Sequence, residues 1–314
     1  MATIAEQLTS LANTKTAIKE AIVAKGVQVA DTDPFSAYPA KIGQISGGGG
    51  EPVAKTKYGA SIDNIIGDVN ANGIPLFGEL LSFVGTGIIE LSGDYKFGYR
   101  FYATTWDRVY FPDLVRIGNG ASTLSDAACC QSSFGYNRYT GGSVVVDMPK
   151  LESIDGNYVA QNMFSVGYVE EINLPKLQII KGIQAAGRMF SSCKIKNVSL
   201  PSLTTISGQN AAQAMFTDCN IETVDLSALT TISGSTSCRE MFKNNRNLIR
   251  ADFPSLTTIT DANALGSSSS NGMFSGCTGL LEIHFRADAQ ATIEGLSGYS
   301  SKFGATSSTI YFDL

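Results

Sequence analysis

Apolar residues recur along the C-terminal two thirds of the chain as pairs that enclose a single residue. The pairs stand at Val109/Phe111, Val146/Met148, Ile172/Leu174, Val198/Leu200, Val224/Leu226, Ala251/Phe253, Ile283/Phe285 and Ile310/Phe312. Their second members are 37, 26, 26, 26, 27, 32 and 27 residues apart. A nearly constant period predicts a solenoid of about eight rungs, in which each unit buries its apolar side only by stacking on its neighbours.

One unit is the stretch Cys193–Ile206, which returns almost unchanged as Cys219–Ile232. We expect each unit to contain a short strand, a turn through the PSLTTI phrase and a return segment. The return segment has its own anchor, a phenylalanine that follows a methionine, at Phe164, Phe190, Phe216, Phe242 and Phe274. The two longer steps require insertions, at DAACCQSSFGYNRYTGG and DANALGSSSSNG.

A different pattern opens the chain. Residues 3–25 are expected to form a helix between Thr3, as the N-cap, and Gly26. Apolar residues follow one face at heptad-like spacing: Ile4, Leu8, Leu11, Ile18 and Ile22. A lone helix of this length is marginal in water, so the stripe needs a partner. That partner is either the rest of its own segment or other copies of the chain, and we favour a homo-oligomer, specifically a trimer.

These patterns divide the chain into four parts. Residues 1–46 form a helical attachment or oligomerisation module, with a strand-like piece and a short helix opened by Pro34 after the first helix. Residues 47–51 are a glycine linker, residues 52–105 are a β-rich connecting and capping region, and residues 106–314 are the solenoid. The expected fold class is mainly β.

Amino-acid composition and charge exclude several classes of function. Charged residues are only 16% of the chain and glycines number 32, as suits a turn-rich extracellular or virion protein. The net charge of -5 provides no basic surface for nucleic acid. No apolar run is long enough for membrane insertion. The N-terminal residues lack the features of a secretory signal, so we expect synthesis in a cytoplasm and release by another route, such as lysis.

The side chains with reactive chemistry do not assemble a recognisable catalytic or metal motif. With six cysteines, one histidine and no CxxC spacing, a zinc site is not expected. Cys193, Cys219 and Cys277 each follow the anchor phenylalanine by three residues and should be buried, the alternative being a disulfide between rungs. His284 is expected to be solvated. We expect no cofactor and no enzymatic activity.

Recognition is expected on the outward face of the strands, because side chains alternate there. The residue enclosed by each apolar pair forms one column. Its candidate ligand-binding members are Tyr110, Asp147, Asn173, Ser199, Asp225, Asp252 and His284, and Tyr311 continues it. A second column, two residues earlier, contains Arg108, Val145, Glu171, Asn197, Thr223, Arg250, Glu282 and Thr309. The alternative for this face is a solvated sheet without a ligand.

The insertion at 121–142, with Phe134, Tyr136 and Tyr139, is a second candidate contact surface.

Two resemblances add to this interpretation. Residues 8–42, with the pieces TKTAIKEAI, AKGV and PFSAYPAKI, resemble a short module of tailed-bacteriophage tail, fibre and baseplate proteins. The motif MFxxC followed by IxxVxLPxLxxI, over roughly residues 106–285, resembles the BspA-type leucine-rich repeat. The period also lies in the range of leucine-rich repeats. Members of that family are mostly surface adhesins and binding proteins.

Together these features favour a structural and binding protein of a phage virion, such as a tail fibre or baseplate part. Its N-terminus would attach to other virion proteins, and its repeat body would contact a host surface glycan or protein. The alternatives are a bacterial cell-surface leucine-rich-repeat adhesin and a glycan hydrolase on a solenoid. The hydrolase would need two carboxylates at catalytic separation, for which Asp225 and Asp252 are the adjacent pair.

Overall fold

The computed structural model describes residues 4–24, 29–30, 32–34, 38, 55–59, 80–92, 98–99, 101–118, 120, 129–296, 298–304 and 308–314. The chain divides into two compact units, Met1–Val53 and Ala54–Leu314. The predicted caps Thr3 and Gly26, the glycine linker 47–51 and residues 121–128 lie outside the described residues.

The first unit contains the predicted helix, α1, over Ile4–Ala24. Ile22 is buried in a small cluster with Val29 and Tyr38, and Ile18 packs against it. The Lys15 ammonium lies over the Tyr38 ring, 5.8 Å from its centroid. The apolar stripe is therefore partly covered by its own segment, which is the alternative that we did not favour. The side chains of Ile4, Leu8 and Leu11 lie outside the described residues.

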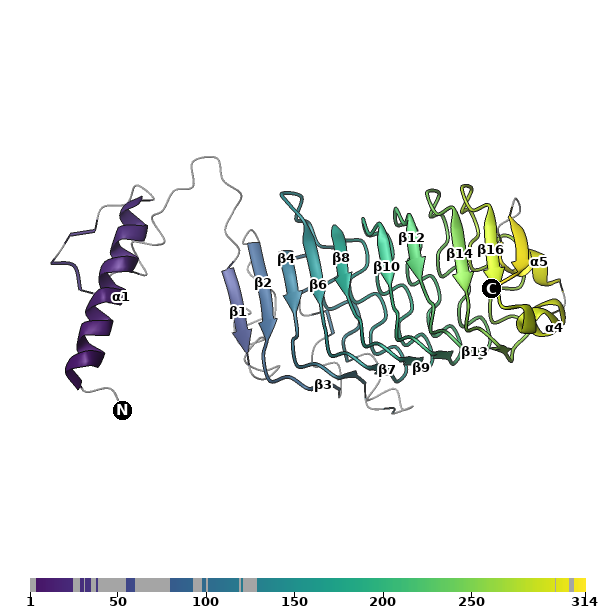
Figure 1. Ribbon diagram of the computed structural model, residues 1–314, viewed down its shortest axis with the longest axis horizontal. Helices are drawn as coiled ribbons and strands as arrows, with labels where there is room; N and C mark the ends of the chain where they lie inside the picture. The colour runs from purple at the N-terminus through teal and green to yellow at the C-terminus, as the bar shows by residue number, and fades with distance from the viewer. Residues whose placement is uncertain are drawn as a thin grey trace. The chain divides into compact units, whose positions relative to one another are not determined.

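The second unit is the predicted solenoid, a mainly β structure of about eight parallel turns (Figure 1). Its first ladder runs through β1 (Lys55–Gly59), β2 (Leu80–Gly85), β4 (Thr105–Tyr110), β6 (Val144–Asp147) and β8 (Val169–Asn173). It continues through β10 (Asn197–Ser199) paired with β12 (Thr223–Asp225), and through β14 (Arg250–Phe253), β16 (Glu282–Phe285) and β17 (Thr309–Phe312). The ladder begins before residue 106, since β1 and β2 pair in parallel with it.

A second parallel ladder corrects the predicted turn through PSLTTI. It contains β3 (Glu90–Leu91), β5 (Arg116–Ile117), β7 (Ser153–Asp155), β9 (Ile179–Lys181), β11 (Thr205–Ser207), β13 (Thr231–Ser233) and β15 (Thr258–Ile259). Only the first part of the phrase turns, where the Leu203 N–H donates to the Leu200 carbonyl at 3.1 Å. The rest is a strand because Ile206 is buried between two half-exposed residues, the alternation that a sheet face requires.

Glycine makes the corner that follows this second strand. Gly208 has a φ of +104°, and a Cβ there would lie 2.6 Å from the carbonyl oxygen of Gly182 in the preceding rung. Gly234 repeats the contact one rung later, 2.7 Å from Gly208. Neighbouring rungs approach so closely at this corner that a side chain would force them apart.

The return segments close each turn and carry a column of buried, stacked phenylalanines. Phe190 and Phe216 lie 5.6 Å apart between ring centroids with an angle of 3° between planes, and Phe164 and Phe190 lie 5.3 Å apart. Phe101 and Phe134 extend the column toward the N-terminus. Residues 129–139 are thus a return segment of the repeat, which corrects their assignment to a surface insertion.

The C-terminal end is covered by short helices. A 3₁₀ helix, η2 (Ala287–Ala289), leads into α4 (Gln290–Glu294), and α5 (Tyr299–Lys302) follows. Ile293 of α4 is buried, and α4 contacts β15, the last strand of the second ladder. This arrangement covers an edge that would otherwise expose unpaired backbone groups. No helix in the described part of the chain is both long and apolar enough to cross a lipid bilayer.

Candidate functional site

The return segments lead from the second ladder back to the next strand of the first ladder, and their backbone repeats an unusual conformation. Every fourth residue has left-handed φ, as at Asn162 (+54°) and Val166 (+53°), and at Arg188 (+53°) in the next rung. Alternate N–H groups donate to the following rung, as Val166 does to Ser191 at 2.7 Å. The N–H groups between them close tight turns within the rung, as Ser165 does to Asn162 at 3.1 Å. Most N–H groups of the described return segments are therefore hydrogen-bonded while the backbone coils. Left-handed residues such as Arg188 and Asp218 are exposed, whereas Ser132 and Ala214 are buried.

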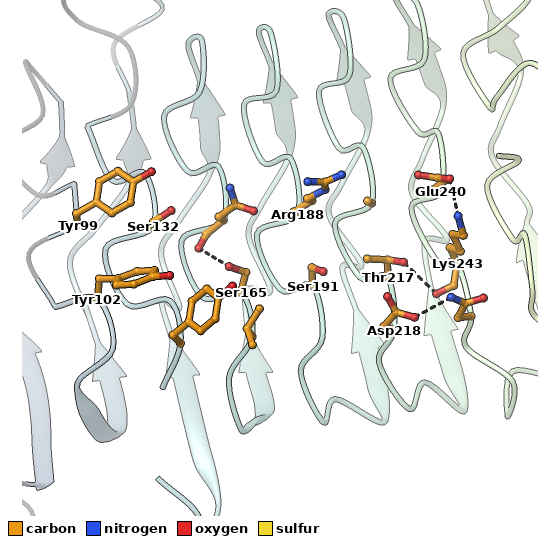
Figure 2. A pocket seen from close by; sticks show the side chains of 15 residues that line it. Tyr99, Tyr102, Ser132, Ser165, Arg188, Ser191, Thr217, Asp218, Glu240 and Lys243 are labelled. Carbon is orange, nitrogen blue, oxygen red and sulfur yellow. Dashed lines mark hydrogen bonds and ion pairs between the residues drawn. The ribbon is translucent and has the colours of Figure 1, made fainter. Parts of the chain in front are cut away.

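Residues of these segments line a groove of about 610 Å³, which we call the return-face groove. Five of the fifteen lining residues are at most 9% exposed, namely Ser132, Ser165, Ser191, Ala214 and Thr217. Its lining positions lie two residues before, one residue after and two residues after the stacked phenylalanines. They are Tyr99, Ser132, Asn162, Arg188, Ala214 and Glu240; Tyr102, Ser165, Ser191, Thr217 and Lys243; and Tyr136, Val166, Asp218 and Asn244. Figure 2 shows the labelled residues in order, from Tyr99 and Tyr102 at one end to Glu240 and Lys243 at the other.

Three tyrosines form the N-terminal end of the groove. The rings of Tyr102 and Tyr136 lie 4.9 Å apart and those of Tyr99 and Tyr102 lie 5.8 Å apart. Tyr99 is 54% exposed, Tyr136 46% and Tyr102 36%. Partial burial, and then the neighbouring Tyr136, raise the pKa of the Tyr102 phenol above its ordinary value. The Tyr102 phenol is therefore uncharged at neutral pH, and the cluster presents three partly apolar rings to solvent.

The rest of the groove is lined by hydroxyl, amide and charged groups. At its C-terminal end the Lys243 ammonium pairs with Glu240 at 2.7 Å, and Asn244 donates to Asp218 at 2.7 Å. Arg188 is exposed and forms no ion pair with another described residue. Arg188 and Lys243 balance Asp218 and Glu240, so the lining has no net charge. Among the described residues, no group of three or more potential metal ligands comes together.

The predicted binding column lies on the first ladder, away from this groove. The register confirms the column itself, since Tyr110 pairs with Asp147, Ser199 with Asp225 and Asp252 with His284. Most of its polar side chains are hydrogen-bonded to one another or to neighbouring residues outside the column. Asp147 accepts bonds from Arg108 at 3.0 Å and from Asn173 at 2.8 Å. None of the predicted column residues lines the return-face groove.

The adjacent carboxylates of this column are also engaged. Asp225 accepts bonds from the Ser199 hydroxyl at 3.3 Å and from the Ser227 N–H at 3.0 Å. Asp252 pairs with the Arg250 guanidinium at 2.8 Å. Each carboxylate thus has its own local partners on its own rung or the neighbouring one.

His284 is not the solvated side chain that we expected. It is only 5% exposed, and its ring stacks on Tyr311 at 4.7 Å between centroids. Its Nδ1 lies 2.7 Å from an oxygen of Asp313 and its Nε2 3.3 Å from an oxygen of Glu282. The column turns inward here because the last strand and the C-terminal residues fold over it, a contact that no local sequence pattern predicts.

The cysteines are buried and free, as the favoured interpretation predicted. The thiol of Cys193 donates to the carbonyl of Phe164 at 3.3 Å, and Cys219 and Cys277 do the same to Phe190 and Phe242. Burial raises the pKa of Cys219 and Cys277 to about 12 and that of Cys193 further. These thiols connect rungs and have no nucleophilic character at neutral pH.

Sequence reasoning missed the groove although a signal was present. The residues around each Met-Phe pair differ from copy to copy, as in GRMFSS, QAMFTD and REMFKN, whereas the core residues are the same in each copy. Variation beside a repeated anchor marks outward positions. We expected outward contact surfaces on the strands and at the insertion 121–142, and gave the other return segments only a packing role. Of the aromatic residues named in that insertion, Tyr136 lines the groove, whereas Phe134 and Tyr139 are buried.

Comparison with known proteins bears on the solenoid alone. No curated protein and no solved structure matches the chain significantly. Nothing in the comparisons points to a phage tail or fibre protein. Residues 157–290 match, in six copies, the family model described as BspA type Leucine rich repeat region, and a repeat body of this kind indicates a binding or adhesin-like role.

Proposed function

We propose that this protein is a non-enzymatic binding protein whose repeat body holds its partner in the return-face groove. The observation that carries the proposal is the groove itself, lined over six successive rungs by side chains on a backbone whose N–H groups are mostly hydrogen-bonded from rung to rung or within tight turns. Binding residues are favoured where a stiff scaffold holds them in place. The partnered carboxylates of the sheet face and the Lys243–Glu240 pair support binding rather than acid–base catalysis.

The proposed place of action is the surface of a phage virion, with the N-terminal module attaching the chain to other virion proteins. The support is the resemblance of residues 8–42 to tail, fibre and baseplate modules. A bacterial cell-surface adhesin is the second candidate and is equally compatible with the repeat body. Antibody detection in purified particles and in cell-envelope fractions separates the two. Recovery with particles supports the virion, whereas recovery only in the envelope contradicts it.

The groove proposal is tested by binding of the labelled full-length chain to a panel of bacterial cells. Arg188→Glu reverses a charge inside the groove, and we expect it to weaken binding about tenfold. Lys176→Glu makes the same change at an exposed position outside the groove and should bind like the parent. Equal binding by both variants would contradict the groove as the site.

The sheet face is tested by the double variant Asp225→Ala with Asp252→Ala. Because neither residue lines the groove, we expect unchanged cell binding. Loss of binding in this variant, with unchanged stability in urea, would place recognition on the strands instead.

A further inference from the structure

The tyrosine end of the return-face groove has a feature that core packing does not explain. Tyr99, Tyr102 and Tyr136 come from two successive rungs, and their rings cluster while remaining at least a third exposed. The stacked phenylalanine column lies directly beneath, at Phe101 and Phe134, and is complete without them. Large rings gathered in solvent beside a groove are the mark of a contact surface.

The lining beyond the tyrosines is suited to hydroxyl-rich ligands. Asn162, which is half-buried, and Arg188, which is exposed, follow in the next rungs, so amide and guanidinium groups continue the surface that the rings begin. Ser165 and Ser191 also line the groove but are only 5% and 9% exposed. A sugar ring has an apolar face of C–H groups and a rim of hydroxyls. The face stacks on an aromatic ring, and the rim exchanges hydrogen bonds with amides, hydroxyls and carboxylates. The groove offers both kinds of contact side by side.

The charge of the lining and the length of the groove restrict the class of ligand further. The balanced lining gives no electrostatic preference for an acidic or a basic chain. Six rungs at a spacing of about 4.8 Å span roughly 24 Å from the first to the last. The groove is therefore long enough for several consecutive rings of a linear polymer rather than a single small sugar.

A peptide is the competing ligand, and the backbone argues against it. Extended peptides commonly add to a sheet edge through main-chain hydrogen bonds. In the described return segments that line the groove, nearly all N–H groups pair with the next rung or close local turns. The described part of the groove thus has no continuous row of unpaired N–H groups for a peptide to extend. Recognition of a proline-rich peptide requires an aromatic-lined groove, whereas the rings here occupy only the first two rungs.

We infer that the return-face groove binds a linear, neutral polysaccharide, one ring of which stacks on Tyr102 and Tyr136. This inference rests on the proposed function and names its ligand class. Tyr99 borders the same sugar, and Asn162 and Arg188 contact the rings that follow.

The test measures binding of the full-length chain to immobilised neutral polysaccharides, namely mannan, dextran, laminarin and xylan, with hyaluronan and a proline-rich peptide array beside them. We expect at least one neutral polysaccharide to bind. That binding should change less than twofold between about 0.05 and 0.5 M salt, because a neutral ligand releases no counterions. Binding only to hyaluronan or only to the peptides would overturn the inference.

Substitutions of groove residues then identify which side chains contact the polysaccharide. Tyr102→Ala and Tyr136→Ala should each weaken polysaccharide binding about tenfold, whereas Tyr102→Phe keeps the ring and most of the affinity. Tyr311→Ala removes a similarly exposed tyrosine, 37% exposed, outside the groove and should bind like the parent. Unfolding in urea checks that each variant is folded. Equal affinities of the parent and the alanine variants would overturn the stacking.

A second arm separates this inference from the proposed function. Bacterial cells are treated with periodate, which cleaves vicinal diols of sugars, and then tested for binding of the chain. Loss of binding supports the polysaccharide. Full binding that remains sensitive to Arg188→Glu, together with no binding to laminarin, whose 1,3-linked rings periodate spares, would overturn the polysaccharide and keep the groove as the site. Binding to no cells and no probes would overturn both proposals.

Discussion

At the scale of single residues, one position in the return segment connects neighbouring rungs by a side-chain hydrogen bond. Cys193, Cys219 and Cys277 donate from this position to the preceding phenylalanine carbonyl. Asn245 occupies the same position between two of them and donates to Phe216 at 2.9 Å. The thiol is thus exchangeable with an amide, because the requirement is a buried donor that reaches the carbonyl.

Burial of the thiols predicts how stability responds to alkaline pH. The pKa of Cys219, Cys238 and Cys277 is raised to about 12 by burial, so the folded chain keeps protons that the unfolded chain loses near pH 9. Stability should therefore fall as pH rises from about 9 to 12. Urea unfolding at several pH values measures the slope, and DTNB should label no thiol rapidly in the native protein.

Cys238→Ala provides the matched control. Ala186 and Ala212 occupy the corresponding position in the two preceding rungs, so the repeat accepts alanine there. The variant should lose less stability than the parent over this range, by roughly 1 kcal/mol per pH unit. Identical slopes, or rapid labelling of the native parent, would contradict the argument.

The left-handed backbone predicts a stabilising substitution. Val166 is β-branched, has a φ of +53° and is 41% exposed, so its side chain is strained without being buried. Val166→Gly should raise the free energy of unfolding by about 0.5–1 kcal/mol, since relief of strain exceeds the added chain entropy. Val145→Gly, in the strand β6, should lower it by about 1 kcal/mol. Equal destabilisation by both, in urea titrations, would be inconsistent with strain at Val166.

At the scale of elements, the return segment is organised by its stacked phenylalanine. Phe216 is fully buried and stacks on Phe190 and Phe242, each 5.6 Å away. Phe216→Ala leaves a cavity between two rings and should cost about 3–5 kcal/mol. Phe216→Leu retains most of the volume and should cost less.

Trp106, the only tryptophan, reports whether this loss spreads. It lies in β4, several rungs away from Phe216. In a cooperative solenoid each rung stabilises the next, so the urea midpoint followed by Trp106 fluorescence should shift with that followed by circular dichroism. A tryptophan transition that stays at the parent midpoint would show that rungs unfold independently.

At the scale of the whole molecule, the two units carry separate roles in our proposal. We expect the full-length chain to self-associate, with a trimer favoured, and residues 54–314 to be monomeric by light scattering. Since Ile18 and Ile22 already pack within their own segment, Ile4, Leu8 and Leu11 are the remaining residues of the predicted stripe. The same oligomeric state for both chains would contradict association through the first unit.

Much of the solenoid was predictable because the repeat consists of apolar residues that become buried only when the units stack. The pairs such as Val198/Leu200 predicted the first ladder and its register, and the Met-Phe step predicted the buried anchors. The second ladder was missed because three residues around Ile206 are too few to show alternation. The return segment of Phe134 was missed because serine replaces the methionine before it.

The sequence alone determined the period, the core positions and the outward column of the strands, since burial and alternation are local properties of a repeating chain. Only the tertiary structure decided which face is hollowed. The return-face groove depends on left-handed residues one repeat apart that align across rungs, and on three tyrosines that meet only when two rungs stack. His284 shows the same limit, because its partners Asp313 and Tyr311 reach it from the next rung and the C-terminus.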